Sequence, residues 1–120
     1  MFYELGNEAF DQGNFEKAIK YYNDTLESGN NSDKVMYNLS ICYFEIGDYN
    51  SSIELANKII SSDDKIMSNL SLFNRGNCFH ELKEYKKAEK DFSKIISLFP
   101  FNSDAYYNRA NAREKLNNSI

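Results

Sequence analysis

Hydrophobic and small residues recur along the chain with the three-to-four-residue spacing of amphipathic helices. The first stripe consists of Phe2, Leu5, Gly6 and Ala9. After the turn Gly13-Asn14, the second stripe consists of Phe15, Ala18, Ile19, Tyr22 and Leu26. The same pattern of helix, turn and helix returns over residues 36–60 and 72–96, and Pro100 ends the last helix because proline cannot continue its hydrogen-bond ladder. The pattern predicts an all-α chain built from helical hairpins.

The hairpins are copies of one unit. The turn-like strings Gly13-Asn14-Phe15, Gly47-Asp48-Tyr49 and Lys83-Glu84-Tyr85 place their aromatic residues 34 and then 36 residues apart. Three asparagines share these spacings, namely Asn38, Asn74 and Asn108. Because several unrelated positions follow one period, the chain consists of internal repeats. The two additional residues are expected between helices, in the polar segment 61–66, as a loop or the start of a helix.

The period divides the chain into one repeat domain over residues 1–120. We expect repeat 1 over 1–32, repeat 2 over 33–66, repeat 3 over 67–102, and a single last helix within 103–120. That helix either caps the stack or is the first half of a truncated fourth repeat. Arg109 and Arg113 suit a face exposed to water, which favours the cap. Whether the chain is a fragment of a longer array stays open.

Residues of the first and third units resemble the tetratricopeptide repeat, whose period is 34. In unit one these are Phe2, Leu5, Gly6, Ala18 and Tyr22. In unit three they are Leu72, Gly76, Phe79, Ala88, Phe92 and Pro100. Unit two departs from the signature, with Ser40 in place of Gly and Ala56 in place of an aromatic residue. The resemblance implies a right-handed α-α superhelix of three hairpins plus a capping helix, with partner peptides bound in a concave groove of first helices.

Helical geometry predicts which residues line that groove. Advancing by about 100° per residue places a ladder of rings and a ladder of amides opposite the buried stripe of the first helices. An asparagine amide offers both a donor and an acceptor to a peptide backbone. We therefore expect a non-enzymatic adaptor that binds an extended peptide through Tyr3, Asn7, Tyr37, Asn38, Ile41, Phe73, Asn74, Asn77, Tyr107, Asn108 and Asn111.

Two alternatives remain. One is a self-associating scaffold, in which the groove or an uncapped end binds a second copy and forms a homo-oligomer. The other follows from the resemblance: some tetratricopeptide co-chaperones hold the C-terminal carboxylate of heat-shock chaperones with lysine, arginine and asparagine. This chain keeps Asn7 and Asn38, but Tyr3, Leu70 and Asn74 occupy the basic places. Its rim also carries three carboxylates that repel an anionic tail and favour a neutral or basic ligand, at Asp11, Glu45 and Glu81.

Composition narrows the remaining function classes. The chain has 120 residues and a formal net charge of −4, with no basic block, so a nucleic-acid partner is disfavoured. Short apolar runs and the lack of a secretory signal predict a cytoplasmic protein with no membrane contact. Two cysteines and one histidine are a poor supply for catalysis, so we expect no enzyme activity, metal site or cofactor. Cys42 and Cys78 share one repeat position, which indicates packing, and His80 lies near the groove.

Overall fold

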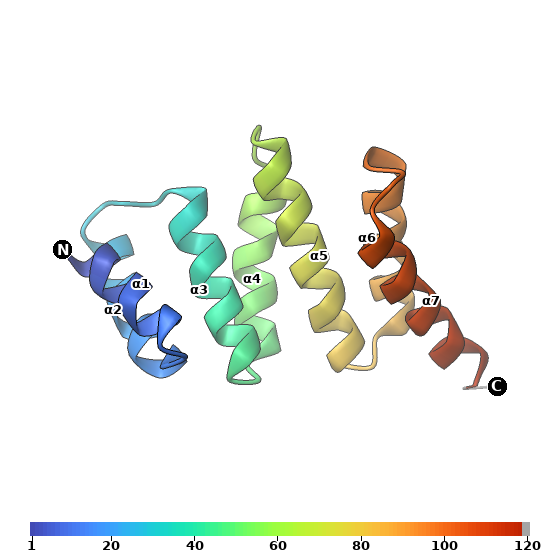
Figure 1. Ribbon diagram of the computed structural model, residues 1–120, viewed down its shortest axis with the longest axis horizontal. Coiled ribbons are helices and arrows are strands. Elements are labelled where there is room, and N and C mark those ends of the chain that lie inside the picture. Colours follow the sequence, from blue (N-terminus) through green and yellow to red (C-terminus); the bar gives the residue numbers. More distant parts are fainter. Residues whose placement is uncertain (119–120) are drawn as a thin grey trace.

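The chain folds entirely into helices and their connections over the part that the structure, a computed structural model, describes, residues 1–118. In these residues, seven α-helices follow one another, and their bounds are α1 (Phe2–Asp11), α2 (Phe15–Glu27), α3 (Asp33–Glu45), α4 (Tyr49–Ile60), α5 (Lys65–Glu81), α6 (Tyr85–Leu98) and α7 (Ser103–Asn117). Each helix packs against the next one along the chain, so the molecule is an extended stack of 49 × 28 × 21 Å (Figure 1). The all-α fold of three hairpins and a final helix is confirmed.

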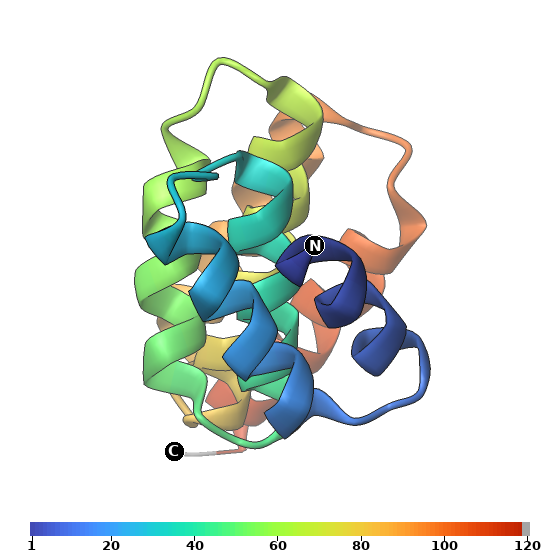
Figure 2. The same ribbon diagram turned by 90° about the vertical axis from the view of Figure 1, so that its left-hand side faces the viewer.

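The stack has two layers of helices. In Figure 1, α1, α3, α5 and α7 lie towards the viewer, and α2, α4 and α6 lie behind them. Within the front layer, α3 contacts α5 and α5 contacts α7. Viewed from the N-terminal end in Figure 2, successive hairpins are rotated relative to one another, as expected of a superhelix. This layering gives α1, α3, α5 and α7 one common face on the side away from the second helices, called the inner face below because it corresponds to the concave side of the superhelix.

The turn inside each hairpin needs a residue in the left-handed backbone region. Gly13 and Gly47 supply it with φ values of 74° and 84°, and the side chains of Asn14 and Asp48 then cap α2 and α4. In the third hairpin the same place is held by Lys83 at φ 62°, although an L-residue with a side chain is strained there. The repeat therefore imposes its turn geometry even where the sequence offers no glycine.

The two helices of a hairpin approach each other where one residue is small. A Cβ atom added to Gly6 would lie 2.7 Å from the ring of Tyr22, and one added to Gly76 would lie 2.7 Å from the ring of Phe92. Both rings are fully buried, so they have little room to move. Unit two reaches the same approach differently, because Ser40 there faces the position of Ala56 rather than an aromatic ring. In unit two the smaller Ala56 thus compensates for the larger Ser40, so the two departures from the repeat signature belong together.

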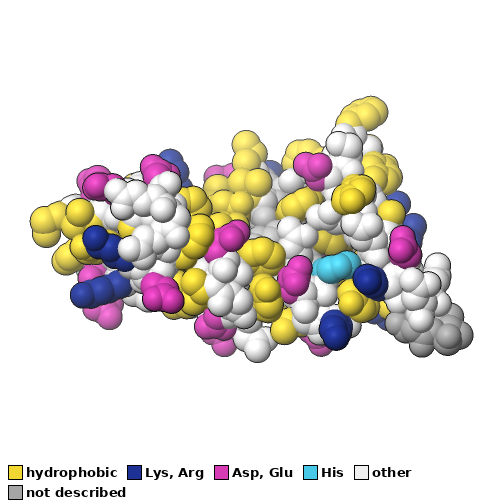
Figure 3. Space-filling model, turned by 60° about the horizontal axis from the view of Figure 1, so that its bottom comes forward, with side chains coloured by type: hydrophobic (Ala, Val, Ile, Leu, Met, Phe, Trp, Pro, Cys, Tyr) yellow, Lys and Arg dark blue, Asp and Glu magenta, His cyan; other side chains and the backbone are white. Residues whose placement is uncertain are grey.

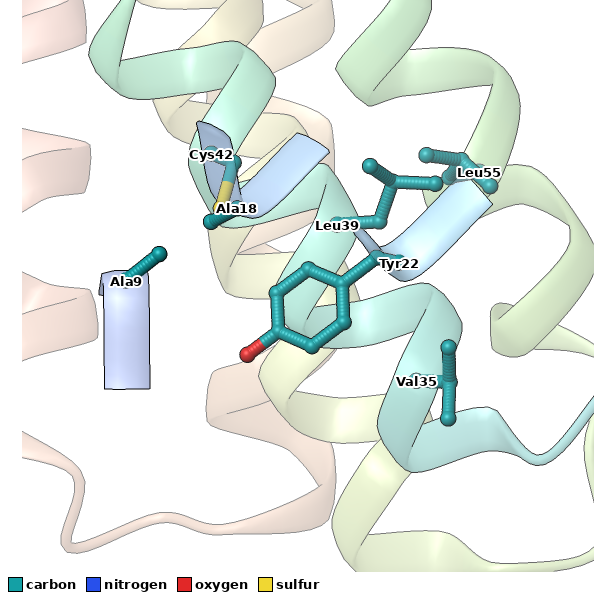
Figure 4. Close-up of a cluster of buried hydrophobic side chains, with 7 residues drawn as sticks. All are labelled: Ala9, Ala18, Tyr22, Val35, Leu39, Cys42 and Leu55. Carbon is teal, nitrogen blue, oxygen red and sulfur yellow. The ribbon is translucent and has the colours of Figure 1, made fainter. Parts of the chain in front are cut away.

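Buried side chains form one cluster at each end of the stack. The N-terminal cluster surrounds Tyr22 and joins the first two hairpins (Figure 4), and it contains Ala9, Ala18, Tyr22, Val35, Leu39, Cys42 and Leu55. The C-terminal cluster surrounds Phe92 and joins the third hairpin to α7, and it contains Leu72, Ala88, Phe92, Ile95, Ala105 and Ala112. Because each hairpin contributes to a shared core, the stack holds its inner face in a fixed shape.

Two details differ from the repeat pattern. Helix α5 has 17 residues against 13 in α3, so it begins at Lys65, within the range 33–66 expected for repeat 2. Ala110 occupies the small position of α7 but is exposed, because no second helix of a fourth unit covers it within the described residues. The division into repeats itself stays a prediction, and its last two residues, 119–120, lie outside the described part.

We predict that Gly76→Ala lowers the free energy of unfolding by about 1–3 kcal/mol, because the new methyl group overlaps the buried ring of Phe92. Urea denaturation followed by circular dichroism measures this difference. At an uncrowded helix position the same substitution stabilises a protein by up to about 1 kcal/mol. A variant as stable as the wild type, or more stable, would contradict this packing.

Candidate peptide-binding face

The inner faces of α1, α3, α5 and α7 bring the predicted rings into one row, with very different exposure. Tyr3 packs against Tyr22 with ring centroids 6.3 Å apart, and Phe73 meets the edge of Phe92 at 5.7 Å. Both are half-buried, as is Tyr37, since each leans on the hairpin's own core. Tyr107 is 69% exposed. The row therefore exposes only part of three rings to a ligand, and Tyr107 at its C-terminal end is the one ring that is largely exposed.

Asn74 corrects the prediction that it offers its amide to a ligand. It is only 5% exposed, and its Nδ2 donates to the hydroxyls of Ser40 at 3.3 Å and Ser52 at 2.9 Å. The Ser52 hydroxyl in turn donates to the Ser40 carbonyl at 2.7 Å, and the Ser40 hydroxyl donates to the carbonyl of Tyr37 at 2.6 Å. Both serines thus use donor and acceptor inside the protein, and Asn74 joins two hairpins rather than facing the groove.

The hairpin before each asparagine decides its environment. Ser40 and Ser52 of unit two correspond to Gly6 and Ala18 in unit one, which offer no hydroxyl to Asn38. Asn38 instead lies near the hydroxyl of Tyr22, and this hydroxyl donates to Asn7 Oδ1 at 2.6 Å. Asn38 and Asn7 both remain half-buried on the inner face.

The Tyr22 hydroxyl is a buried partner of a predicted groove amide, and the helical pattern alone does not indicate it. Its ring belongs to the buried stripe, yet its oxygen reaches the amides of α1 and α3. Burial raises the pKa of Tyr22 to about 12, so the hydroxyl stays protonated and remains a donor. The sequence does hold a signal for this hydroxyl: unit one has a tyrosine at a repeat position where unit three has Phe92, which has no polar atom.

A polar hollow of about 190 Å³ lies between α5 and α7. Asn108 crosses its floor, because its Nδ2 donates to Asn77 Oδ1 at 3.0 Å. The ring of His80 stands edge-on to Tyr85 at 5.0 Å. The hollow is lined by Asn77, His80, Glu81, Phe92, Asn108 and Asn111. Three predicted groove residues, Asn77, Asn108 and Asn111, therefore converge on one concave site. Ile41 lies half-buried on α3, outside this hollow.

Carboxylates occupy one repeated place beside the rings and amides. Asp11, Glu45 and Glu81 are the last residues of α1, α3 and α5, and all three are exposed. The fourth copy of this place, on α7, is Lys115. Figure 3 shows acidic side chains distributed along the molecule on this side, with the single histidine in cyan. The face is thus acidic over its first three hairpins.

The arginines of the described residues face away from this side. Arg75 makes a two-pronged ion pair with Asp91, at 2.9 and 2.7 Å, and its third nitrogen donates to Asn57. Arg109 donates to Ser93 and Arg113 pairs with Glu89. These partners lie on the second helices α4 and α6. The expectation that Arg109 and Arg113 simply face water is therefore wrong in part: Arg109 is half-buried, and both tie α7 to α6.

The two cysteines lie in the core rather than in a reactive site. Both are fully buried, and burial raises the pKa of Cys42 to about 12, with the charge of Glu45 adding to the effect. Burial also raises the pKa of Cys78. Within residues 1–118, no group of three or more His, Cys, Asp or Glu side chains is arranged to hold a metal ion. The helices of the same residues include none that is long and apolar enough to cross a lipid bilayer.

We predict that Asn74→Ala lowers the free energy of unfolding by about 1–3 kcal/mol, because it removes the donor shared by two buried hydroxyls. Asn111→Ala is the matched control, since Asn111 is a half-buried asparagine on the same face of α7. It should change stability by about 0.5 kcal/mol or less. Equal losses in the two variants, measured by urea denaturation, would show that the buried network contributes nothing specific.

We predict that the thiols of the folded chain react with a disulfide reagent at pH 8 at least about 100-fold more slowly than those of the chain in denaturant. The reason is that only the thiolate reacts, and the raised pKa of Cys42 and Cys78 suppresses it in the fold. Absorbance of the released thiol measures both rates. Fast labelling of the native chain would disprove the buried placement.

Comparisons with known proteins agree with this geometry. A family model described as tetratricopeptide repeat matches residues 3–65, and a second model of the same description matches residues 70–102. The Hsp70-Hsp90 organising protein of Plasmodium falciparum (isolate 3D7) is 32% identical over 100 residues, which cover 82% of this chain and 17% of that protein. Tetratricopeptide repeat protein 12 of Homo sapiens is 28% identical, over 93% of this chain and 16% of that protein. The chain spans less than a fifth of these two relatives.

Solved structures share the arrangement of helices. The first tetratricopeptide domain of Spaghetti (RPAP3), bound to the HSP90 peptide SRMEEVD, superposes with a TM-score of 0.86 at 21% identity, over 96% of this chain and 90% of that one. The second such domain of human RPAP3, in complex with the HSP70 peptide SGPTIEEVD, gives a TM-score of 0.81 at 22% identity, over 92% and 90%. At these identities the likeness shows the fold.

Proposed function

The chain belongs to the tetratricopeptide repeat family, and we propose that it is a non-enzymatic module that holds an extended segment of a partner protein against the inner faces of α1, α3, α5 and α7. The observation that carries this proposal is the row of partly exposed rings and amides at repeat spacing, which ends in the hollow between α5 and α7. Structural neighbours with bound peptides support it, because their domains have the same fold.

The remaining groove amides suit a peptide backbone. With Asn74 committed to the core, five asparagines stay at least partly accessible: Asn7, Asn38, Asn77, Asn108 and Asn111. Each net hydrogen bond to a ligand contributes about 0.5–1.5 kcal/mol, so a few of them fall short of the roughly 8 kcal/mol of micromolar binding. Contacts with rings must supply the rest, and Tyr107 is the most exposed ring of the row.

A co-chaperone function is the first alternative, supported by the relatives named Hsp70-Hsp90 organising protein and by the HSP90 and HSP70 peptides of the neighbours. Both peptides end in two glutamates, a valine and an aspartate. The places where the family has the cations of its carboxylate clamp hold here an aromatic ring, an aliphatic side chain and a buried amide, at Tyr3, Leu70 and Asn74. The acidic tail is therefore the weaker candidate for this groove.

Self-association is the second alternative, and the outer face of α7 favours it. Ala110 is exposed there and Tyr106 is 42% exposed beside a hollow of about 520 Å³. A second helix of a fourth repeat would pack on this face, so another copy of the chain could do the same. Sedimentation velocity over a range of concentrations tests it. A mass that stays monomeric would end this alternative.

We predict that Tyr107→Ala weakens binding of a groove ligand by about 5- to 30-fold, because truncating an exposed ring at an interface costs about 1–2 kcal/mol. The ligand is obtained by selecting from a random peptide library on the purified chain, and fluorescence anisotropy gives its dissociation constant. Tyr106→Ala is the matched control, because it removes the ring of the preceding residue, which lies on the outer face beneath Arg109. Failure to select any peptide, or equal losses in both variants, would refute the groove.

A further inference from the structure

Resting on the proposed groove, we propose that its ligand is a basic internal segment, a stretch of a partner protein that carries lysine or arginine side chains, and not an acidic C-terminal tail. The positive charges of such a segment would complement the carboxylates along the inner face. Three features of the described residues support it: where the carboxylates stand, where the arginines are used, and what lines the hollow between α5 and α7.

The carboxylates stand where folding alone disfavours them. A helix ends in a partial negative charge, so cations stabilise its last turn and carboxylates oppose it. Yet α1, α3 and α5 each end in an exposed acidic residue, at Asp11, Glu45 and Glu81. None of the three forms a salt bridge with any described side chain. Each hairpin thus adds a site of negative potential to the groove rim, and stacking places these sites in one series.

The three arginines of the chain do not offset this potential. Arg75, Arg109 and Arg113 belong to first helices, but each bonds to a side chain of α6. Their guanidinium groups are consequently directed to α6. At the places where the family clamps a carboxylate, Tyr3, Leu70 and Asn74 carry no charge. An anionic tail would therefore find no cation at these three places, while the rim of the first three hairpins presents it with carboxylates.

The hollow between α5 and α7 suits the side chain of a lysine or arginine. Glu81 supplies a carboxylate to the lining. Asn111 and Asn77 line the same hollow, and Asn77 Oδ1 already accepts from Asn108. A long cationic side chain can extend into this hollow until its charged head meets the carboxylate of Glu81. Ligand cations further along would meet Glu45 and Asp11 in turn.

The test uses three acetylated and amidated fluorescent peptides: three repeats of Ser-Lys-Tyr-Gly, and two counterparts with every lysine replaced by glutamine or by glutamate. The peptide SRMEEVD with a free carboxylate is the fourth probe. We expect the lysine peptide to bind the wild-type chain about tenfold more tightly than the glutamine peptide at 50 mM salt, and this preference to fall several-fold at 500 mM salt. The glutamate peptide and SRMEEVD should bind more weakly still.

The decisive variant is Asp11→Asn/Glu45→Gln/Glu81→Gln, which should lose the tenfold preference for lysine. Its control is Glu16→Gln/Glu27→Gln/Glu54→Gln, which removes the same charge from exposed positions on α2 and α4. The control should keep the preference, because its substitutions lie outside the groove helices. Neutralising helix C-termini removes an unfavourable charge, so the decisive variant should remain folded.

The other outcomes separate this inference from the proposed function. Tightest binding of SRMEEVD, equal binding of the three capped peptides, or no binding of any would overturn the basic-ligand inference. In each of these cases a library peptide that depends on Tyr107 would leave the groove function standing. Equal loss of the lysine preference in both triple variants would assign it to net charge and would also overturn the inference.

Discussion

Close approach of the two helices within each hairpin is the constraint on which the rest of this structure depends. It requires a small residue wherever the partner helix presents a large one, as Gly6 does beneath Tyr22 and Gly76 beneath Phe92. In unit two the large partner is missing and Ser40 takes the place of glycine. This contact fixes the rotation of each first helix about its axis. The side of α1, α3, α5 and α7 that faces away from the second helices is consequently the inner face in every unit, and it carries the row of rings and amides.

The exchange in unit two also changes the groove. Replacing an aromatic residue by Ala56 and an alanine by Ser52 leaves a small, polar environment between the second and third hairpins. Asn74 occupies it and satisfies both serine hydroxyls, so an amide is withdrawn from the ligand face. Where the preceding hairpin is apolar, Asn38 and Asn108 stay half-buried. Asn38 then lies near the Tyr22 hydroxyl, and Asn108 donates to Asn77. Core chemistry in one unit thus sets which groups the next unit can show to a partner.

Much of the fold could be predicted from the sequence because it rests on local, repeated signals. The period of 34 and 36 residues, the turn strings and Pro100 located all the hairpins, and the helix after residue 103 was expected as well. Helical phase also placed the groove residues on the first helices. It could not reveal that Asn74 is buried, since that depends on pairing with residues 22 and 34 positions away in a different hairpin.

The arginines illustrate the same limit. A side chain that long can reach water or a neighbouring helix, and the positions of Asp91 on α6 and Asn57 on α4 decide that Arg75 turns towards the second helices. The early start of α5 was equally open, because the polar segment before it suits a loop and a helix start alike until Asp64 caps the helix. Periodicity thus assigns a residue to a side of its helix, and three-dimensional packing assigns its partner.

The network of Asn74, Ser40 and Ser52 makes the order of the hairpins matter. Repeat arrays commonly grow and shrink by duplication or loss of whole units, which keeps the period intact. Here, loss of the second unit would set Asn74 against Gly6 and Ala18, which have no hydroxyl to accept its protons. Units two and three are therefore matched neighbours, because an amide of one is satisfied only by the hydroxyls of the other.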